Sequence, residues 1–155
     1  MPALADLRQR LDAVVRRLAF APPLLARLVI GVVFTGSGWG KLHNLGQVTQ
    51  YFASLGIPFP EYQAPFVSSI ELACGALVLA GLATRLAAVP LIGTMVVALA
   101  TALAPKIDGL SSLFGLSEFL YIALLTQLAI SGAGAASLDR LIARRLDMPR
   151  ATVRA

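Results

Sequence analysis

Four ionisable residues lie inside or at the ends of long apolar runs of this sequence, and their side chains are the best placed to do chemistry. They are Arg27, Lys41, Glu71 and Glu118. A charged group at the centre of a bilayer costs about 2.5 to 3.5 kcal/mol on insertion scales, so each of them needs a partner, a route to the lipid surface or a function. Side chains of this kind form proton relays in membrane proteins.

Glu71 is the most informative of these residues, because its carboxylate is too short to reach the membrane surface. It lies about seven positions, or roughly 10 Å, after the start of the apolar run at Ala64. Lys41 and Glu118 lie at the same end of two other runs. We therefore predict that Lys41, Glu71 and Glu118 form a catalytic cluster beside a site for a flat ligand. The ligand-binding candidates around this cluster are Trp39, His43, Ser68, Gly75 and Tyr121.

Two interpretations of this cluster remain open. In the structural one, Lys41 and a glutamate form a buried ion pair that only fixes the packing of the helices. In the functional one, the carboxylate or the lysine exchanges a proton with a quinol, a substrate or water. Arg27 lies about one turn into its run and can extend to lipid phosphates, so we assign it, with Arg85, to lipid contact and membrane topology.

The apolar runs define the elements that must position these residues. The chain has 155 residues, of which 57% are hydrophobic and 14% charged, whereas a soluble domain carries about 25% charged residues. Runs of about 20 apolar residues cross a bilayer as helices. The sequence therefore predicts an all-α integral membrane four-helix bundle over residues 22–136, with spans at about 24–42, 64–83, 86–104 and 116–134.

Two basic segments flank this bundle. In residues 1–21, apolar side chains recur every three or four positions between arginines, which predicts an amphipathic helix on the inner leaflet or, alternatively, against a partner protein. The apolar positions are Leu4, Leu7, Leu11, Val14 and Leu18. The segment lacks the apolar core and cleavage site of a signal peptide, so we expect it to remain on the protein. Residues 137–155 form a basic tail.

The arginines predict the orientation of the bundle. In the four-span arrangement ten of them fall on one side, and basic residues favour the cytoplasmic side. Both termini are therefore predicted to be cytoplasmic, in the inner membrane of a bacterium. The opposite side carries the loops 43–63 and 105–115. In the first loop a short helix is predicted, with one apolar face formed by Leu45, Val48, Phe52 and Leu55.

Composition excludes several classes of function. The net charge is +5, but the arginines form terminal blocks without interleaved aromatics, so no nucleic-acid partner is predicted. A single cysteine, Cys74, and a single histidine, His43, cannot form a zinc site or a bis-histidine haem site. No flavin, haem or metal motif is present, so the electron carrier of a redox function must be a quinone or lie on a partner.

Small residues within the runs predict close helix contacts. Gly36 and Gly40 are four positions apart in the first run, which is the spacing that lets two helix backbones approach each other.

Several short motifs together resemble the DoxX family of small four-span bacterial membrane proteins, over residues 26–138. The segments that carry the resemblance are Arg27–Gly31 with Gly38 and Lys41, Phe52–Pro58, Glu71–Gly75, Gly81–Arg85 and Gly132–Asp139. Arg27, Lys41, Glu71 and Arg85 match the characteristic polar positions of the family. The resemblance implies that these positions are important, without giving any of them a catalytic role.

The family resemblance implies a membrane bundle linked to redox metabolism, either in sulfur-compound:quinone oxidoreductases or beside oxidative-stress enzymes. We therefore predict a multi-pass membrane subunit of a redox system that binds quinone and handles protons through Glu71. The alternative is a non-catalytic membrane anchor or assembly partner, and a small transporter is a third hypothesis. The predicted partners are membrane lipids and either a second protein or further copies of this chain.

Overall fold

The computed structural model describes residues 8, 11–15 and 17–146, and every regular element in this part of the chain is a helix. The elements are α2 (Ala21–His43), α3 (Leu45–Ser54), α4 (Pro60–Ala80), α5 (Thr84–Thr101), the 3-10 helix η1 (Ala104–Lys106), α6 (Leu110–Gly115), α7 (Ser117–Ser131) and α8 (Leu138–Leu146). Prolines near the start of α2 and α4 favour helix initiation, because the missing N–H is not needed there. The predicted fold class, an all-α membrane helical bundle, is confirmed.

Three of the helices are long and apolar enough to cross a bilayer. These are α2, α4 and α5, with 23, 21 and 18 residues. The fourth, α7, has 15 residues and is therefore about 22 Å long. The predicted run 116–134 is longer than this helix because Gly132 and Gly134 adopt positive φ angles of 78° and 76°, which an α-helix does not allow.

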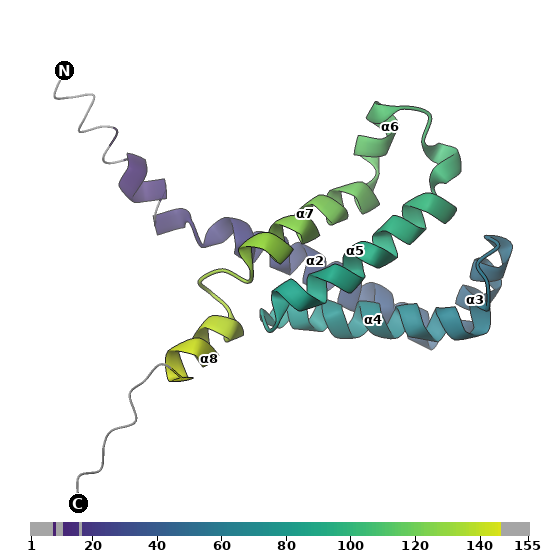
Figure 1. Ribbon diagram of the computed structural model, residues 1–155, viewed down its shortest axis with the longest axis horizontal. Coiled ribbons are helices and arrows are strands. Elements are labelled where there is room, and N and C mark those ends of the chain that lie inside the picture. Colours follow the sequence, from purple (N-terminus) through teal and green to yellow (C-terminus); the bar gives the residue numbers. More distant parts are fainter. Residues whose placement is uncertain (1–7, 9–10, 16, 147–155) are drawn as a thin grey trace, which may run out of the picture.

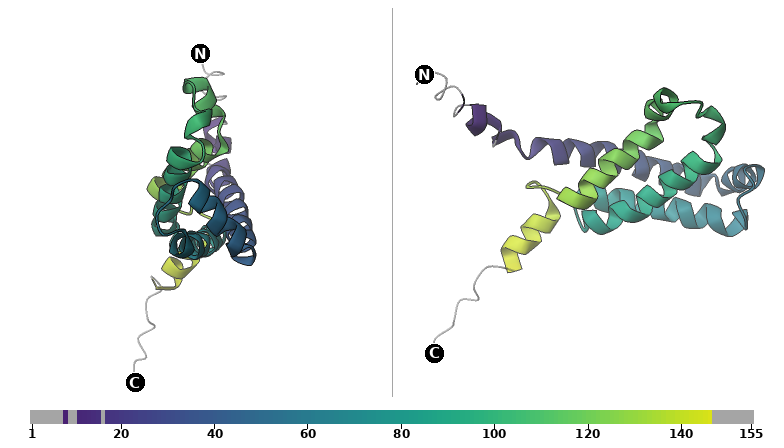
Figure 2. Two further views of the ribbon diagram at one scale, coloured as in Figure 1. Left: turned by 90° about the vertical axis from the view of Figure 1, so that its right-hand side faces the viewer. Right: turned by 45° about the horizontal axis from the view of Figure 1, so that its top comes forward.

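The long helices form two antiparallel pairs that lie against each other (Figures 1 and 2). One pair is α2 with α4 and the other is α5 with α7, and a short turn joins α4 to α5. The core between the pairs is formed by buried apolar residues, including Ile30, Phe34, Val78, Leu91, Leu125 and Leu128. At one end of the bundle α2 and α5 begin and α4 and α7 end, and we call this end the basic end. The opposite end, which carries α3 and α6, is called the loop end.

Glycines bring α2 and α4 into backbone contact, although at different positions from those predicted. A Cβ atom added to Gly31 would lie 2.6 Å from Leu79 Cβ, and one added to Gly75 would lie 2.6 Å from Thr35 N. Gly38 contacts the backbone of α4 in the same way. The predicted contact through Gly36 and Gly40 is not found among the described residues, where no other helix comes within 4 Å of a Cβ at either position.

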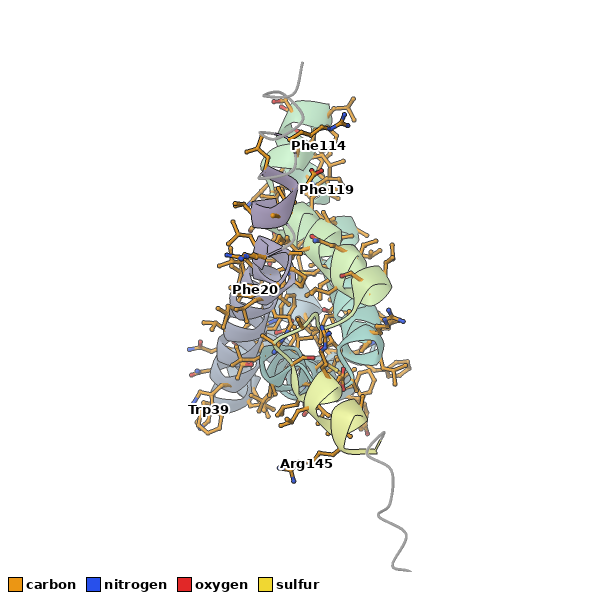
Figure 3. The ribbon with its side chains drawn as sticks, turned by 90° about the vertical axis from the view of Figure 1, so that its left-hand side faces the viewer. Phe20, Trp39, Phe114, Phe119 and Arg145 are labelled. Carbon is orange, nitrogen blue, oxygen red and sulfur yellow. The ribbon has the colours of Figure 1, made fainter. Side chains whose placement is uncertain are left out.

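Amphipathic segments leave the bundle at the basic end. Residues 11–15 and 17–18 are helical, and their apolar side chains are exposed, including Leu11, Val14 and Leu18. Leu4 and Leu7 lie outside the described residues, and the position of this segment on the inner leaflet stays a prediction. The C-terminal helix α8 likewise exposes the apolar side chains of Leu138, Leu141 and Ile142 beside Arg145 (Figure 3).

Candidate functional site

A buried ion pair joins the two long helices α2 and α4. Lys41 Nζ lies 2.6 Å from Oε1 and 2.7 Å from Oε2 of Glu71, and Ser37 Oγ donates a hydrogen bond of 2.9 Å to Oε2. The Glu71 side chain is 2% exposed, whereas that of Lys41 is 32% exposed. The carboxylate is therefore enclosed by its partners, and Lys41 is the member of the pair whose side chain remains partly exposed.

Helix geometry explains why these three side chains meet. Ser37 and Lys41 are four residues apart on α2 and so lie on one face, which packs against α4. Glu71 is eleven residues after the start of α4 at Pro60, which places it about 16 Å along the helix. The predicted distance of roughly 10 Å was counted from Ala64, which lies four residues after the start of α4. At this depth a carboxylate without a partner is strongly destabilised.

A cavity of about 760 Å³ borders this ion pair. It lies between the two helix pairs toward the loop end, where α3 contributes Val48, Tyr51 and Phe52 and α5 contributes Thr94 and Met95. Apolar and aromatic side chains form most of its lining, and Ser37, Lys41 and Glu71 are among its few polar groups. Ligand sites in proteins have this size and character, with few polar groups in an apolar wall.

Glu118 and Tyr121 on α7 line the same cavity, as predicted. Among the described residues Lys41 pairs with Glu71 and not with Glu118, whose Oε2 accepts a hydrogen bond of 3.1 Å from the neighbouring Ser117 hydroxyl. The Tyr121 ring meets the buried Phe34 ring edge to face, with 5.9 Å between the ring centroids. The predicted triad is therefore an ion pair on α2 and α4 with a separate carboxylate across the cavity.

The other predicted ligand-binding residues lie away from the cavity. Trp39 and His43 contact each other on the outside of α2, with ring centroids 4.3 Å apart, and Trp39 points away from the bundle (Figure 3). Ser68 is fully buried and donates to the Ala64 carbonyl oxygen, and Gly75 packs against the α2 backbone. The placement of these four residues in a ligand site is corrected, because the α2–α4 contact turns them outward or into the helix interface.

Arg27 does not extend to the lipid surface as predicted. Its side chain is 3% exposed, and its guanidinium donates to the carbonyl oxygens of Val78, Leu79, Ala133 and Ala136 at distances of 2.6 to 3.0 Å. The first two are in the last turn of α4, where Val78 O also accepts the Gly81 N–H, and the others follow α7. Arg27 is therefore an internal clamp that joins three segments at the basic end.

Several residues of these sites were not found by sequence analysis. Ser37 was missed, although its spacing of four from Lys41 places it on the same helix face. Asp139 was also missed. Its Oδ1 accepts a hydrogen bond of 2.9 Å from the backbone N–H of Ala83, which precedes α5. No local pattern indicates that contact, because 56 residues separate the two groups.

Metal binding has no support from the geometry of the described residues. Within 8, 11–15 and 17–146, no group of three or more His, Cys, Asp and Glu side chains is placed to hold an ion. The groups that could bind a ligand in the cavity are hydrogen-bonding side chains, above all the Lys41 ammonium, which suits an oxygen acceptor.

Comparison with known proteins places these features in a family. The DoxX family model matches residues 23–104, a range that contains Arg27 and the ion pair but ends before Gly132–Asp139. A Bacillus subtilis (strain 168) protein named "Putative oxidoreductase CatD" is 34% identical over 121 residues, covering 77% of this chain and 85% of that protein. No solved structure matches the chain.

Two further relatives carry names that state only a membrane location. "Inner membrane protein YqjF" of Escherichia coli (strain K12) is 29% identical over 122 residues, covering 79% of this chain and 92% of that protein. "Uncharacterized membrane protein Rv3486" of Mycobacterium tuberculosis (strain ATCC 25618 / H37Rv) is 34% identical over 140 residues, covering 82% of this chain and 86% of that protein. Because the family model matches more than half of the chain and these relatives align along most of it, the chain is a membrane protein of the DoxX family.

Proposed function

We propose that this protein is a membrane subunit of a redox system and that it binds a quinone in the cavity beside Lys41 and Glu71. The observation that carries the proposal is the ion pair itself, which lies deep between two membrane helices and has its ammonium at the wall of a largely apolar cavity. The name of the Bacillus subtilis relative is compatible with a redox role.

The cavity suits the chemistry of a quinone. A quinone has a flat ring with carbonyl oxygens and an apolar tail, and the cavity of about 760 Å³ combines one ammonium group with aromatic and aliphatic walls. Lys41 Nζ can donate a hydrogen bond to a carbonyl oxygen, and the rings of Tyr121 and Phe66 can contact the flat ring. The cavity is lined by residues of the long apolar helices α2, α4 and α5, which is compatible with an apolar ligand that enters from the lipid.

The ion pair has a defined role in such a site. Conversion of a quinone to a quinol takes up two electrons and two protons, and the reverse reaction releases them. Lys41 Nζ can deliver a proton to the quinone oxygen that it hydrogen-bonds. Glu71 holds the ammonium in position, and protons can pass between Glu71 and Lys41. The electrons come from, or go to, a redox centre of a partner protein, for example a flavin or a metal.

Quinone binding can be measured directly. The full chain in lipid nanodiscs is titrated with a short-chain ubiquinone and a short-chain naphthoquinone. We expect Lys41→Met to weaken binding about tenfold, because a hydrogen bond from a charged group contributes about 1.5 to 3 kcal/mol. The matched control is Lys106→Met, which removes an exposed lysine outside the cavity and should bind as the parent does.

Glu71→Gln tests the proton function separately, with Glu61→Gln on the exposed first turn of α4 as its control. In the assembled redox system, Glu71→Gln should abolish quinone-linked turnover while the subunit remains inserted. Unchanged quinone binding in Lys41→Met, together with normal turnover in Glu71→Gln, would refute the proposal. The protein would then be a non-catalytic anchor in which the ion pair only fixes packing.

We also propose that both termini face the cytoplasm of a bacterium and that the cavity opens toward the outer side. The basis is the arginine bias, since Arg85, Arg140 and Arg145 are at the basic end. Reporter fusions to each terminus should be active only with a cytoplasmic reporter, and activity of a periplasmic reporter would contradict this orientation.

A further inference from the structure

A second hollow, of about 580 Å³, lies at the basic end, on the opposite side of the membrane bundle from the quinone cavity that we propose. It is formed by the start of α5, the segment from Gly132 to Ser137 and the start of α8. Arg85 and Arg140 line it, and both are exposed. The proposed function does not use this hollow.

The charge in this hollow is positive. Asp139 also lines it, but this carboxylate accepts the Ala83 N–H and lies near the Arg27 guanidinium, so it is already engaged. Among the described residues, neither the Arg85 nor the Arg140 side chain has a carboxylate oxygen within 4.0 Å of its nitrogens. The ion pair found among these residues joins Lys41 and Glu71, toward the loop end. Two guanidinium groups are thus available to a ligand.

The backbone keeps one of these groups close to the floor of the hollow. Gly132 has a φ of 78°, and a Cβ added there would lie 3.1 Å from Arg85 Nε. A glycine at this position therefore lets the Arg85 side chain lie against the 132–137 segment. Ser131 and Ser137 also line the hollow, but their hydroxyls already donate to the carbonyl oxygens of Gln127 and Gly134. Direct recognition of an anion therefore falls to the arginines.

Apolar side chains continue from the hollow along the membrane-facing surface. Leu86, at the start of α5, lines the hollow and is 76% exposed, and Ile130, near the end of α7, is 74% exposed. Both belong to helices of the membrane bundle, and Ile130 directly precedes Ser131, which lines the hollow. The surface combines two cationic groups at the level of the headgroups with an apolar strip below them.

We propose that this hollow binds an anionic glycerophospholipid, with its phosphate held by Arg85 and Arg140 and its acyl chains along Leu86 and Ile130. Guanidinium groups suit phosphate because their planar donor geometry allows paired hydrogen bonds. The apolar strip favours a lipid over a water-soluble phosphate, which would leave these side chains without a partner. The site would fix the basic end of α5 and α8 to the inner leaflet.

The experiment measures which lipids stay on the purified protein. The full chain is exchanged from mixed phosphatidylglycerol and phosphatidylcholine nanodiscs into mild detergent, and the retained lipids are counted by native mass spectrometry. We expect one phosphatidylglycerol to be retained over phosphatidylcholine. Arg85→Gln and Arg140→Gln should each weaken retention about fivefold, the effect of one basic residue near an anionic leaflet. The control is Arg145→Gln, which changes an exposed arginine outside the hollow.

Three outcomes would overturn this proposal. The first is equal retention of the two lipids, which would show only non-specific lipid around the bundle. The second is unchanged retention in the Arg85→Gln/Arg140→Gln double variant. The third is displacement of the lipid by millimolar inorganic phosphate, which would identify a site for a soluble anion. Both arginines are exposed, so the glutamine variants should fold.

Discussion

The two ends of the bundle each bury a charged group, but they satisfy it in different ways. At the basic end, Arg27 donates to four backbone carbonyl oxygens from two segments, the end of α4 and residues 133–136, and is almost fully enclosed. Toward the loop end, Glu71 is enclosed by Ser37 and Lys41, and Lys41 remains 32% exposed at the wall of a cavity. Four of the five N–H donors of Arg27 are used within the protein and its side chain is buried, whereas the Lys41 side chain borders a cavity.

This difference separates a structural charge from a functional one. Backbone carbonyls cannot be removed by mutation, so loss of Arg27 takes one donor from each of the four. An ion pair of two side chains can be replaced by two neutral groups, so the fold does not require its charges. We therefore expect stability to depend on Arg27 and ligand chemistry to depend on Lys41 and Glu71.

Removal of the Arg27 clamp should have the largest effect on stability. We expect Arg27→Leu to lower the free energy of unfolding by roughly 5 kcal/mol, because each hydrogen bond from a charged donor contributes about 1.5 to 3 kcal/mol. Reversible unfolding in mixed micelles, followed by circular dichroism, measures this loss. The exposed Arg145→Gln variant should unfold as the parent does. A loss below about 1 kcal/mol in Arg27→Leu would mean that the clamp is not structural.

Neutralisation of both members of the ion pair should cost little stability, in contrast to loss of the Arg27 clamp. Lys41→Met alone should lower the free energy of unfolding by about 3 kcal/mol, since it leaves a buried carboxylate without its cation. The double variant Lys41→Met/Glu71→Gln should recover to within about 1 kcal/mol of the parent, because neutral groups then fill the same space. Additive losses in this double-mutant cycle would show that the two side chains are not energetically coupled.

Glycine substitutions test the close backbone contact between α2 and α4. Gly38→Ala should destabilise the protein by about 1 to 3 kcal/mol, because the added methyl group overlaps the α4 backbone. Gly36→Ala is its matched control, on the same helix but with free space around it. It should stabilise α2 by up to about 1 kcal/mol through helix propensity. Equal effects of the two substitutions on thermal unfolding would contradict the described contact of α2 with α4.

The smallest effect is expected at Asp139, which supports the basic end from α8. Asp139→Ala should cost about 1 kcal/mol, as does the loss of other side-chain acceptors at helix starts. Hydrogen exchange at the Ala83 amide should increase in this variant. Asp12→Ala, which changes an exposed carboxylate outside the bundle, should leave the exchange rate at Ala83 unchanged. Protection of Ala83 that persists in Asp139→Ala would exclude this contact.

Sequence analysis predicted the membrane bundle and the pairing of Lys41 with a glutamate. Both follow from local or one-dimensional properties, since uncharged runs need a bilayer and a buried carboxylate needs a cation. It misplaced Trp39 and His43 because spacing gives which residues share a helix face but not which face meets the neighbouring helix. The glycine contacts failed for the same reason, as Gly31 and Gly38 face α4 and Gly36 does not.

The sequence by itself therefore determined the fold class, the presence of long apolar helices and the resemblance to the DoxX family. These properties depend on composition and on motifs that are read along the chain. Only the tertiary structure decided that Arg27 is a clamp, because its acceptors at Val78, Ala133 and Ala136 are 51, 106 and 109 residues away. It also decided that Lys41 borders a cavity, since a cavity is the space that several packed helices leave between them and has no counterpart in any single segment.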